Sequence, residues 1–371
     1  MGQIALVTWD GGGNVAVTVA IAVALRASGH AVTVVGPRSL QSAVEPLALG
    51  YAELGIMPPG DPEQRMSYLL DVAQGTDTML AELGRLTASA DALVIDCNLS
   101  WALQSRVARR TAVLVHTALG IYLPVWQAVL DTANVQRAAR GVPPLAAAAD
   151  AWARADRLLV TSIAHFDRPV PVGRLRPVYV GPVSGPWRPR TGSVAIQPAC
   201  DRPRVLISYS TESLQNSPQR VQTALDAFAG LPLDVLATTS GAFNAARLRV
   251  PGNATVLDYL PHGSVMATVE LMVCHGGHGT TMAALSCGVP LVCVPGLGRD
   301  QAPIAARVSE LGLGIALDSD ATTGTIRDAV MAILADRRYR SRAQEFAHRT
   351  GQPDGTRHAA IELLAMLDEA I

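Results

Sequence analysis

Short apolar stretches alternate with longer amphipathic stretches along most of the chain. In the first repeat, an apolar strand over 3–8 leads through a glycine-rich turn to a helix over 15–28 and a second strand over 31–36. This order of elements is typical of a β-α-β unit. The same periodicity then predicts helices over 40–47, 63–85 and 103–108 and strands over 92–96, 112–116 and 157–162. Such alternation predicts an α/β fold with a doubly wound parallel sheet.

Polar residues stand at the ends of several predicted strands. Thr8, Asp96 and His116 each end a strand of the first half of the chain. Ligands of open parallel sheets bind outside the carboxyl ends of the strands. We therefore expect the loops after these residues to face one cleft.

The alternation is interrupted twice and then resumes. Residues 117–150 mix prolines and aromatic residues with helical stretches, which we interpret as a pocket-forming insertion, and residues 168–190 are dense in proline, glycine and arginine. From Arg204 onward a second set of strands and helices follows, with helices expected over 219–229, 280–287, 302–311, 324–335, 341–350 and 357–370. We predict an N-terminal domain over 1–184, a linker over 185–203 and a C-terminal domain over 204–371. Whether one of the last helices crosses back to the first domain stays open.

Composition supports two globular domains and excludes some classes of partner. The chain has 371 residues, of which 49% are hydrophobic, 16% charged and 4% aromatic. This length exceeds one compact core, and the aliphatic balance suits buried parallel strands. The net charge of -1 provides no global basic field for nucleic acid or an anionic membrane. Any phosphate must therefore be bound by local loops.

The cysteine spacing indicates a reducing compartment, and the lengths of the apolar runs bear on membrane insertion. The five cysteines show no CxxC spacing and leave one over, so we expect neither a disulfide framework nor a metal site. No apolar run reaches the roughly 18 residues that would span a bilayer, and the N-terminus opens directly into a strand. We expect a cytoplasmic protein without stable membrane insertion, either a monomer or a homodimer.

The stretch over 272–301 carries most of the functional signal. A short strand delivers the chain to His275 and Gly277, and a helix is expected to open near Gly279 to Thr281. Free backbone N–H groups and the positive dipole end make such a helix start an anion cradle. His278 offers a second imidazole donor, and a hydroxyl follows at Thr280. The pattern predicts a diphosphate site.

A glycine-rich turn in the first half offers a competing interpretation. Residues 11–16 fit the dinucleotide pattern G-x-G-x-x-G/A, which is typical of nicotinamide enzymes. The second strand ends in Gly-Pro-Arg instead of the acidic residue that would hold a ribose 2′-hydroxyl, although Arg38 could meet a 2′-phosphate. The alternative for Gly11 and Gly12 is a turn that needs glycine simply to reverse the chain.

The segment over 259–301 resembles the donor signature of the large UDP-glycosyltransferase family, which includes bacterial enzymes that glycosylate natural products. The matching motifs are Tyr259-Leu260-Pro261, the HxGxxT turn over 275–280, Gly288-Val289-Pro290 and Asp300-Gln301. Residues 28–30 and 178–182 extend the resemblance over most of the chain. It implies a GT-B fold, with two Rossmann-like doubly wound domains facing a central cleft, and an inverting glycosyltransferase.

The resemblance also implies roles for individual residues in binding a nucleotide-sugar. The implied donor-binding residues are Tyr259, Leu260 and His262 near the nucleoside, His275, Gly277, Gly279 and Thr280 at the diphosphate, and Asp300 and Gln301 at the sugar hydroxyls. Ser210 and Thr211, at the end of the first strand of this domain, are expected to join them. Helix-end N–H groups can stabilise a departing diphosphate without a metal, so no cofactor is expected. A core role is the alternative for His275.

Two departures from the family pattern bear on specificity and catalysis. Many relatives carry a ribose-binding glutamate where this chain has Ala283, so we hypothesise a dTDP-activated deoxysugar in preference to a UDP-hexose. Relatives also carry a general-base histidine where this chain has Asn14, and an amide cannot accept the acceptor's proton. Asp96 matches the aspartate that partners that histidine.

Asp96 could therefore act as the base directly or through water, with Asp10 and His116 as rivals and Asn14 orienting the acceptor. A turn or helix-capping role is the alternative for Asp96. A catalytically silent homologue, or an auxiliary partner of another transferase, is the alternative for the whole chain.

An apolar set of residues could line the acceptor site on the first domain. They are Trp9, Leu119, Tyr122, Trp126 and Val129. A flat aromatic aglycone would suit them, and either O- or C-glycosylation would be open to a phenolic acceptor. Aliphatic packing is the alternative interpretation of these residues.

Overall fold

The computed structural model describes most of the chain. The described residues are 2–55, 77–99, 108–128, 130–139, 141–170, 176–183, 201–210, 216–351 and 354–369. They fall into two compact units, and the first of these is discontinuous in sequence. Unit 1 comprises Met1–Arg190 with Pro353–Ile371, and unit 2 comprises Thr191–Gln352.

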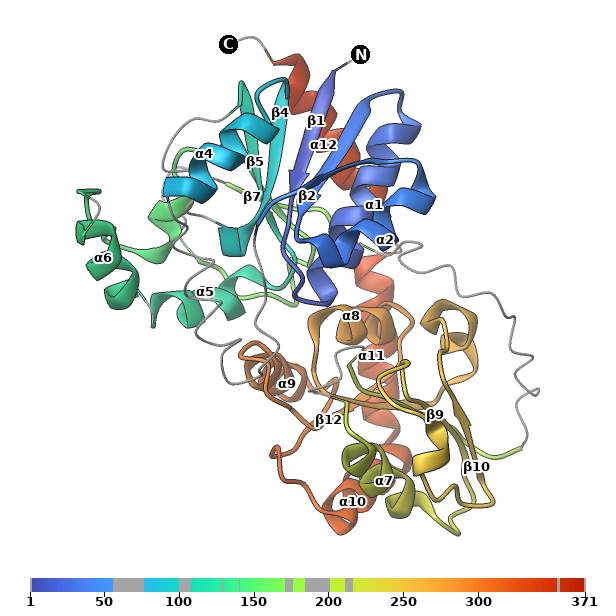
Figure 1. The fold of residues 1–371 in the computed structure, drawn as a ribbon. Helices are drawn as coiled ribbons and strands as arrows, with labels where there is room; N and C mark the ends of the chain where they lie inside the picture. Colours follow the sequence, from blue (N-terminus) through green and yellow to red (C-terminus); the bar gives the residue numbers. More distant parts are fainter. Residues whose placement is uncertain are drawn as a thin grey trace. The chain divides into compact units, whose positions relative to one another are not determined.

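Unit 1 is built on a parallel sheet with the strand order β3-β2-β1-β4-β5-β6-β7 (Figure 1). The strands are β1 Gln3–Val7, β2 Ala31–Gly36, β3 Gly50–Glu53, β4 Ala92–Asp96, β5 Arg110–Val115, β6 Arg157–Val160 and β7 Pro177–Tyr179. The central strands β4 and β5 are buried along their whole length, because helices cover both faces of the sheet. The strand order reverses between β1 and β4, so the topological switch point lies at the ends of these two strands.

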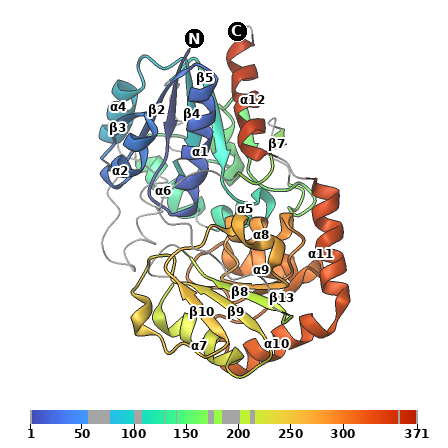
Figure 2. The ribbon, with the colours of Figure 1, turned by 90° about the vertical axis from the view of Figure 1, so that its right-hand side faces the viewer.

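The helices of unit 1 include one contributed by the end of the chain. They are α1 Gly13–Ala27, the short α2 Gln41–Val44, α4 Asp77–Leu86, α5 Leu119–Gln127, α6 Leu130–Ala139 and α12 Gly355–Asp368. α1 and α12 lie side by side on the sheet (Figures 1 and 2). Leu363 and Met366 of α12 join Leu25 of α1 in one buried cluster with the sheet. The last helix therefore completes the core of the first unit, which is the possibility that the sequence left open for the end of the domain predicted over 204–371.

Unit 2 repeats the architecture with the strand order β10-β9-β8-β11-β12-β13. Its parallel strands are β8 Arg204–Ser208, β9 Asp234–Thr238, β10 Ala254–Leu257, β11 Leu271–Cys274, β12 Leu291–Cys293 and β13 Gly314–Ala316. Its helices are α7 Pro218–Phe228, α8 His278–Ser286, α9 Gln301–Glu310, α10 Thr323–Ala335 and α11 Arg337–Thr350. The switch point here lies between β8 and β11. Cys274 is the register partner of both Ser208 and Cys293, so three strand ends meet beside the predicted diphosphate loop.

The structure adds detail that the hydrophobic pattern missed. β3 and β7 are edge strands whose residues are mostly half-buried, so they lack the continuous apolar signal of the central strands. Helix α8 begins at His278, with Gly277 as its N-cap, and so starts earlier than expected. The helix predicted over 103–108 and the first part of the one predicted over 63–85 lie outside the described residues. In the part of the chain that is described, no helix combines the length and apolar character that crossing a membrane requires.

Replacing Gly355 by alanine is expected to destabilise unit 1. A Cβ at this helix start would lie 2.5 Å from the carbonyl oxygen of Gly181, so α12 must shift away from the segment after β7. Overpacking of this kind typically costs about 1–3 kcal/mol. The measurement is the free energy of unfolding by denaturant titration.

Gly84→Ala is the matched control. It lies inside α4, and an added Cβ meets nothing within 4 Å, so a small stabilisation from helix propensity is expected. Equal stability of wild type and Gly355→Ala would contradict the packing described for α12.

Candidate functional site

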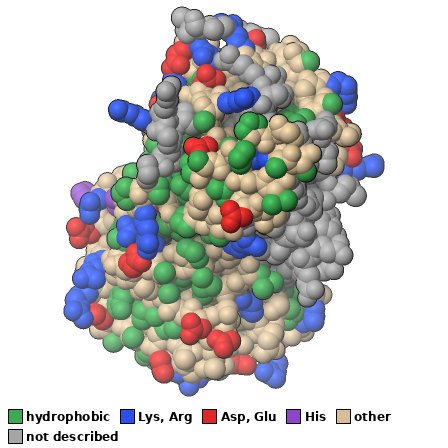
Figure 3. Space-filling view, turned by 90° about the vertical axis from the view of Figure 1, so that its left-hand side faces the viewer, with side chains coloured by type: hydrophobic (Ala, Val, Ile, Leu, Met, Phe, Trp, Pro, Cys, Tyr) green, Lys and Arg blue, Asp and Glu red, His purple; other side chains and the backbone are tan. Residues whose placement is uncertain are grey.

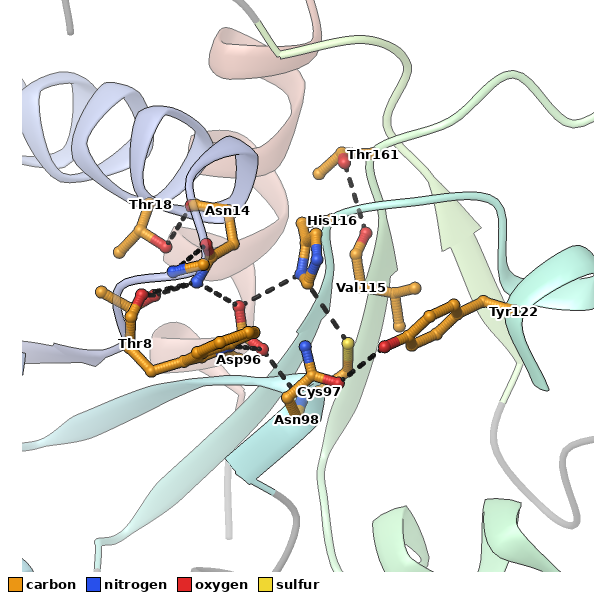
Figure 4. A network of polar contacts seen from close by, with 12 residues as sticks. Thr8, Asn14, Thr18, Asp96, Cys97, Asn98, Val115, His116, Tyr122 and Thr161 are labelled. Atoms are coloured by element: carbon orange, nitrogen blue, oxygen red, sulfur yellow. Dashed lines mark hydrogen bonds and ion pairs between the residues drawn. The ribbon is translucent and has the colours of Figure 1, made fainter. Parts of the chain in front are cut away.

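The carboxylate of Asp96 lies at the switch point of unit 1 and is fully buried. Its Oδ1 accepts hydrogen bonds from Trp9 Nε1 at 3.2 Å and from the Asn98 amide at 2.9 Å. Its Oδ2 accepts one from Asn14 Nδ2 at 3.2 Å and faces His116 Nδ1 at 3.1 Å (Figure 4). A buried carboxylate requires such partners, because an isolated one would be strongly destabilised. The structure thus brings three of the four predicted catalytic residues together.

The fourth candidate base, Asp10, stands apart from this network. It is half-buried in the turn between β1 and α1, and none of the hydrogen bonds described around Asp96 involves it. The described contacts of Asp96 and His116 therefore do not include the carboxylate of Asp10.

His116 follows β5 directly, and its side chain is 18% exposed. Burial by itself lowers the pKa of the imidazole, but the adjacent Asp96 carboxylate and the Cys97 group outweigh burial, so the pKa lies well above its usual value. Because Nδ1 is directed at Asp96, Nε2 is the nitrogen that remains for another molecule. The pair has the arrangement of an oriented general base: an imidazole held by a carboxylate.

Asn14 is a structural partner of the carboxylate. Its Nδ2 also lies 3.0 Å from Thr8 Oγ1 and 2.8 Å from the carbonyl oxygen of Trp9, and its Oδ1 accepts from the Gly11 amide at 3.1 Å. The side chain is almost completely buried. The sequence suggested that Asn14 could orient the acceptor; in the structure its polar atoms are engaged within the chain. Gly11 and Gly12 fit the turn interpretation, since a Cβ on Gly11 would clash with the Trp9 ring and Gly12 has φ 83°.

Cys97 adds a sulfur atom to this cluster. Its Sγ lies 3.9 Å from His116 Nδ1, and the ligand atoms of Asp96, Cys97 and His116 all lie within 4.8 Å of one another. Among the described residues this is the one group with the spacing to hold a metal ion. Burial and the neighbouring Asp96 raise the pKa of the Cys97 thiol, which opposes the thiolate that a metal would need.

Helix α5 places aromatic side chains beside His116. The Tyr122 hydroxyl donates to Asn98 Oδ1 at 3.0 Å, and its ring centroid lies 6.5 Å from that of His116 (Figure 4). Trp126, one turn later, makes an edge contact with Tyr122 at 6.4 Å. Of the other predicted acceptor residues, Leu119 is completely buried in the core, and the Trp9 indole donates to Asp96. Leu119 is therefore a core packing residue, as the alternative interpretation held. Val129 lies outside the described residues.

Asp167, which the sequence analysis did not single out, fixes the start of α5. Its Oδ1 accepts from the amides of Gly120 at 2.8 Å and Ile121 at 3.3 Å, and its Oδ2 accepts from the Tyr179 hydroxyl at 2.8 Å. Burial raises the pKa of this carboxyl, and these hydrogen bonds oppose the rise. An aspartate more than forty residues from the helix that it caps has no local sequence signal.

In unit 2 the strand ends surround the N-terminus of α8. His275 and His278 are both buried, whereas Gly279 is exposed and Thr280 is half-buried. Burial lowers the pKa of His275 to about 3, helped by the charge of Arg220 and by His262. His275 Nδ1 has no hydrogen-bond partner among the described residues. The predicted anion cradle therefore combines a helix N-terminus with the neutral imidazole of His275.

The predicted nucleoside side of this site has its own hydrogen bond. His262 Nε2 lies 3.0 Å from Ser208 Oγ at the end of β8, and burial lowers the His262 pKa to about 4. Tyr259 is half-buried and Leu260 is buried, directly before His262. Ser208 was not a predicted site residue, because a serine that ends an apolar strand looks like ordinary strand sequence.

The remaining predicted donor residues occupy neighbouring loops. Asp300 is the half-buried N-cap residue of α9, and Gln301 is only 3% exposed. Gln301 Oε1 accepts a hydrogen bond from the Gly296 amide at 2.6 Å. The side-chain oxygen that was expected to contact a sugar hydroxyl therefore binds the preceding loop of the chain instead. Ser210 is half-buried after β8, and its carbonyl oxygen accepts from Asn216 Nδ2 at 2.8 Å. Thr211 lies outside the described residues.

Comparison with known proteins shows similarity to glycosyltransferases over part of the chain. Residues 222–363 match the family model of the erythromycin biosynthesis protein CIII-like C-terminal domain. The NDP-glycosyltransferase YjiC of Bacillus subtilis is 30% identical over 172 residues, which is 46% of this chain and 43% of that protein. A PGL/p-HBAD biosynthesis rhamnosyltransferase of Mycobacterium bovis is 34% identical over 177 residues, covering 47% of this chain and 38% of the other. Over somewhat less than half of its length, the chain is therefore similar in sequence to known glycosyltransferases.

Solved structures extend the similarity of fold to the whole chain. A calicheamicin glycosyltransferase aligns with a TM-score of 0.78 at 23% identity, covering 100% of this chain and 99% of the other. A spinosyn rhamnosyltransferase complexed with thymidine diphosphate gives 0.71 at 19% identity, covering 98% and 100%. Both units therefore have the Rossmann-like form of the GT-B fold, as predicted. The matches to the two curated relatives span less than half the length of each.

The surface is consistent with the modest net charge. On the face shown in Figure 3, acidic and basic side chains are interspersed among hydrophobic ones, and neither sign dominates. This face therefore offers no extended basic patch for an anion.

The raised pKa of His116 predicts a pH-dependent contribution to stability. The folded-state pKa lies above the unfolded value of 6.5, so the contribution is fully present below about pH 6.5 and is lost as the pH rises through the raised folded value. We expect wild type to lose stability over that interval, and Asp96→Asn to lose most of this pH dependence. Imidazole NMR titration and urea unfolding across the interval measure the two effects.

His348→Gln, at an exposed position on α11, is the control and is expected to retain the wild-type pH dependence. A His116 imidazole that titrates at or below pH 6.5 in wild type would refute the ion pair with Asp96.

Proposed function

We propose that the chain is an inverting, metal-independent glycosyltransferase that moves a sugar from a dTDP- or UDP-sugar onto a hydrophobic, aromatic natural-product acceptor. Unit 2 would bind the nucleotide-sugar and unit 1 the acceptor. The observation that carries this proposal comes from the half of the chain that is expected to bind the donor. There, the signature residues over 259–301 lie within the matched family domain, and they include the start of α8 at His278.

Leaving-group stabilisation would come from backbone amides and neutral imidazoles. When the bond from the anomeric carbon to the diphosphate oxygen breaks, negative charge grows on that oxygen. The N-terminus of α8 and the half-buried Thr280 offer donors to this charge. His275 is neutral because its pKa is about 3, so it would act as a hydrogen-bond donor and not as a fixed cation.

Acceptor activation is assigned to His116. Its Nε2 would take the proton of the acceptor hydroxyl while that oxygen attacks the anomeric carbon, and the nucleoside diphosphate would leave from the opposite side. Asp96 is a poorer base, because its buried carboxylate already accepts four contacts and faces the imidazole. It would instead orient His116 and stabilise the imidazolium that forms. A phenol-activated ring carbon could replace the hydroxyl, which would give C-glycosylation.

The donor is proposed to be a dTDP-deoxysugar. Ala283 stands half-buried on α8 where many relatives have a ribose-binding glutamate, and deoxyribose loses least from that absence. A structural neighbour described as a spinosyn rhamnosyltransferase complexed with thymidine diphosphate supports this choice.

The predictions of a cytoplasmic location and of a monomer or homodimer stand unchanged.

A catalytically silent nucleotide-sugar binder is the second candidate. The observation that favours it is Asn14, which occupies the place of the family's base and is engaged within the chain. Purified protein that binds dTDP-sugars but neither transfers nor hydrolyses them would favour this candidate.

His116→Ala is expected to lower kcat by roughly 100-fold to 10,000-fold, the usual contribution of a general base. Asp96→Asn should also lower kcat, because it removes the charge that orients and supports the imidazole. Wild-type kcat should rise with pH up to the raised pKa of His116. Product formation with a panel of aromatic aglycones, followed by mass spectrometry, provides the measurement.

Asp10→Asn is the matched carboxylate control and should retain nearly full activity, because the hydrogen bonds around His116 do not include Asp10. Full activity of His116→Ala, with loss of activity in Asp10→Asn, would reverse the assignment of the base.

A preference for dTDP donors is expected when one sugar is offered on both nucleotides. Ala283→Glu should shift the preference toward UDP, because a carboxylate can accept hydrogen bonds from ribose hydroxyls that deoxyribose lacks. The measurement is the ratio of kcat/KM for the two donors. Ala283→Gln controls for side-chain size, and a wild-type preference for UDP would reject the dTDP hypothesis.

A further inference from the structure

Arg220 reaches from the start of α7 to a different part of unit 2. Ser217 caps this helix, its Oγ accepting from the Arg220 amide at 3.3 Å, so Arg220 stands in the first turn. A cation there opposes the helix dipole, so the local helix does not explain this residue. Its guanidinium Nη2 donates to the carbonyl oxygens of Val294 at 2.6 Å and Pro295 at 3.1 Å, directly after β12.

The face of the same guanidinium is also occupied. Its central carbon lies 5.0 Å from the ring centroid of Tyr209, which is buried at the end of β8. A cation over an aromatic face is attracted by the ring, and a planar guanidinium can stack while its edges donate. Tyr209 therefore holds Arg220 in the orientation that reaches Val294 and Pro295.

Gln301, which follows this loop in sequence, holds Gly296, the residue after Pro295. Its Oε1 accepts from the Gly296 amide at 2.6 Å. A Cβ on Gly296 would lie 3.0 Å from Gln301 Oε1 and 3.2 Å from Arg220 Nη1, so both side chains press against this one position. Backbone groups of three consecutive residues, 294–296, are thus fixed by two side chains that are far apart in sequence.

We propose that Arg220 is a positioning residue that sets the shape of the loop over 294–300 and thereby places Asp300 for recognition of the donor sugar. This inference rests on the proposed function and on the role at the sugar hydroxyls that the sequence resemblance implies for Asp300. The described contacts of Arg220 are with the loop, since Nη2 donates to two carbonyl oxygens and the face of the group lies against Tyr209. Tyr209 and Gln301 are its partners in this clamp.

The kinetic test compares Arg220→Met with Arg220→Lys. Lysine retains the charge but lacks the planar fork that bridges two carbonyls while stacking. Both variants are expected to raise the KM for the nucleotide-sugar by roughly 10-fold to 100-fold, since misplacing a substrate-positioning group by about 1 Å has effects of this size. Affinity for free dTDP, measured by calorimetry, should change less than about 2-fold. Arg249→Met, which removes an exposed arginine paired with Asp226, is the control and should resemble wild type.

A structural readout tests the clamp independently of activity. Hydrogen exchange of the Gly296 amide should accelerate about 10-fold or more in both Arg220 variants, because the loop opens more readily when its carbonyls are released. Unchanged exchange would overturn the clamp. If Arg220→Lys restored wild-type kinetics while Arg220→Met lost dTDP affinity, the charge would act on the diphosphate and the positioning role would also be wrong.

Failure of the proposed function would be recognised separately. Wild-type protein that transfers no sugar from any donor would remove the enzymatic role, whereas the exchange of Gly296 in the variants would still decide whether Arg220 fixes the loop.

Discussion

The buried carboxylate of Asp96 is the constraint on which the first unit depends. A negative charge at the centre of a parallel sheet is tolerated only where donors surround it, and here the donors come from the turn after β1, the start of α1, the loop after β4 and the end of β5. Those elements must therefore keep their register and their mutual spacing. The same requirement fixes the orientation of His116, so the stability of the site and its chemistry have one physical origin.

The two units use the same topology for opposite electrostatic purposes. In unit 1, a strand-end carboxylate raises the pKa of His116 and keeps a charged pair at the switch point. In unit 2, burial lowers the pKa of His275 and His262, and the cradle relies on backbone amides and neutral imidazoles. Under the proposed function, such a neutral cradle would bind a diphosphate through directed hydrogen bonds and would let the product leave without a strong ion pair. A charged dyad suits the uptake and release of a proton.

Hydrophobic periodicity was sufficient to predict the parallel-sheet α/β fold of both units. Central strands such as β4 and β8 are continuous apolar runs, and strand-end polar residues identified both switch points. Contacts between distant segments were not predictable, because pairings such as Asp167 with the start of α5 depend on tertiary packing. His116 could be proposed as a rival base, but only the register of β4 and β5 brings it within 3.1 Å of Asp96.

Asn14 connects the family pattern with this structure. Its amide supplies one of the donors that the buried carboxylate needs, so replacing the family's histidine by asparagine leaves that contact in place. The imidazole then comes from the end of β5 and faces the same carboxylate oxygen. The requirement imposed by Asp96 is for donors of suitable geometry, not for a particular residue at the start of α1. In this chain the carboxylate–imidazole pair at the switch point therefore takes its histidine from the end of β5, while position 14 of α1 supplies an amide donor.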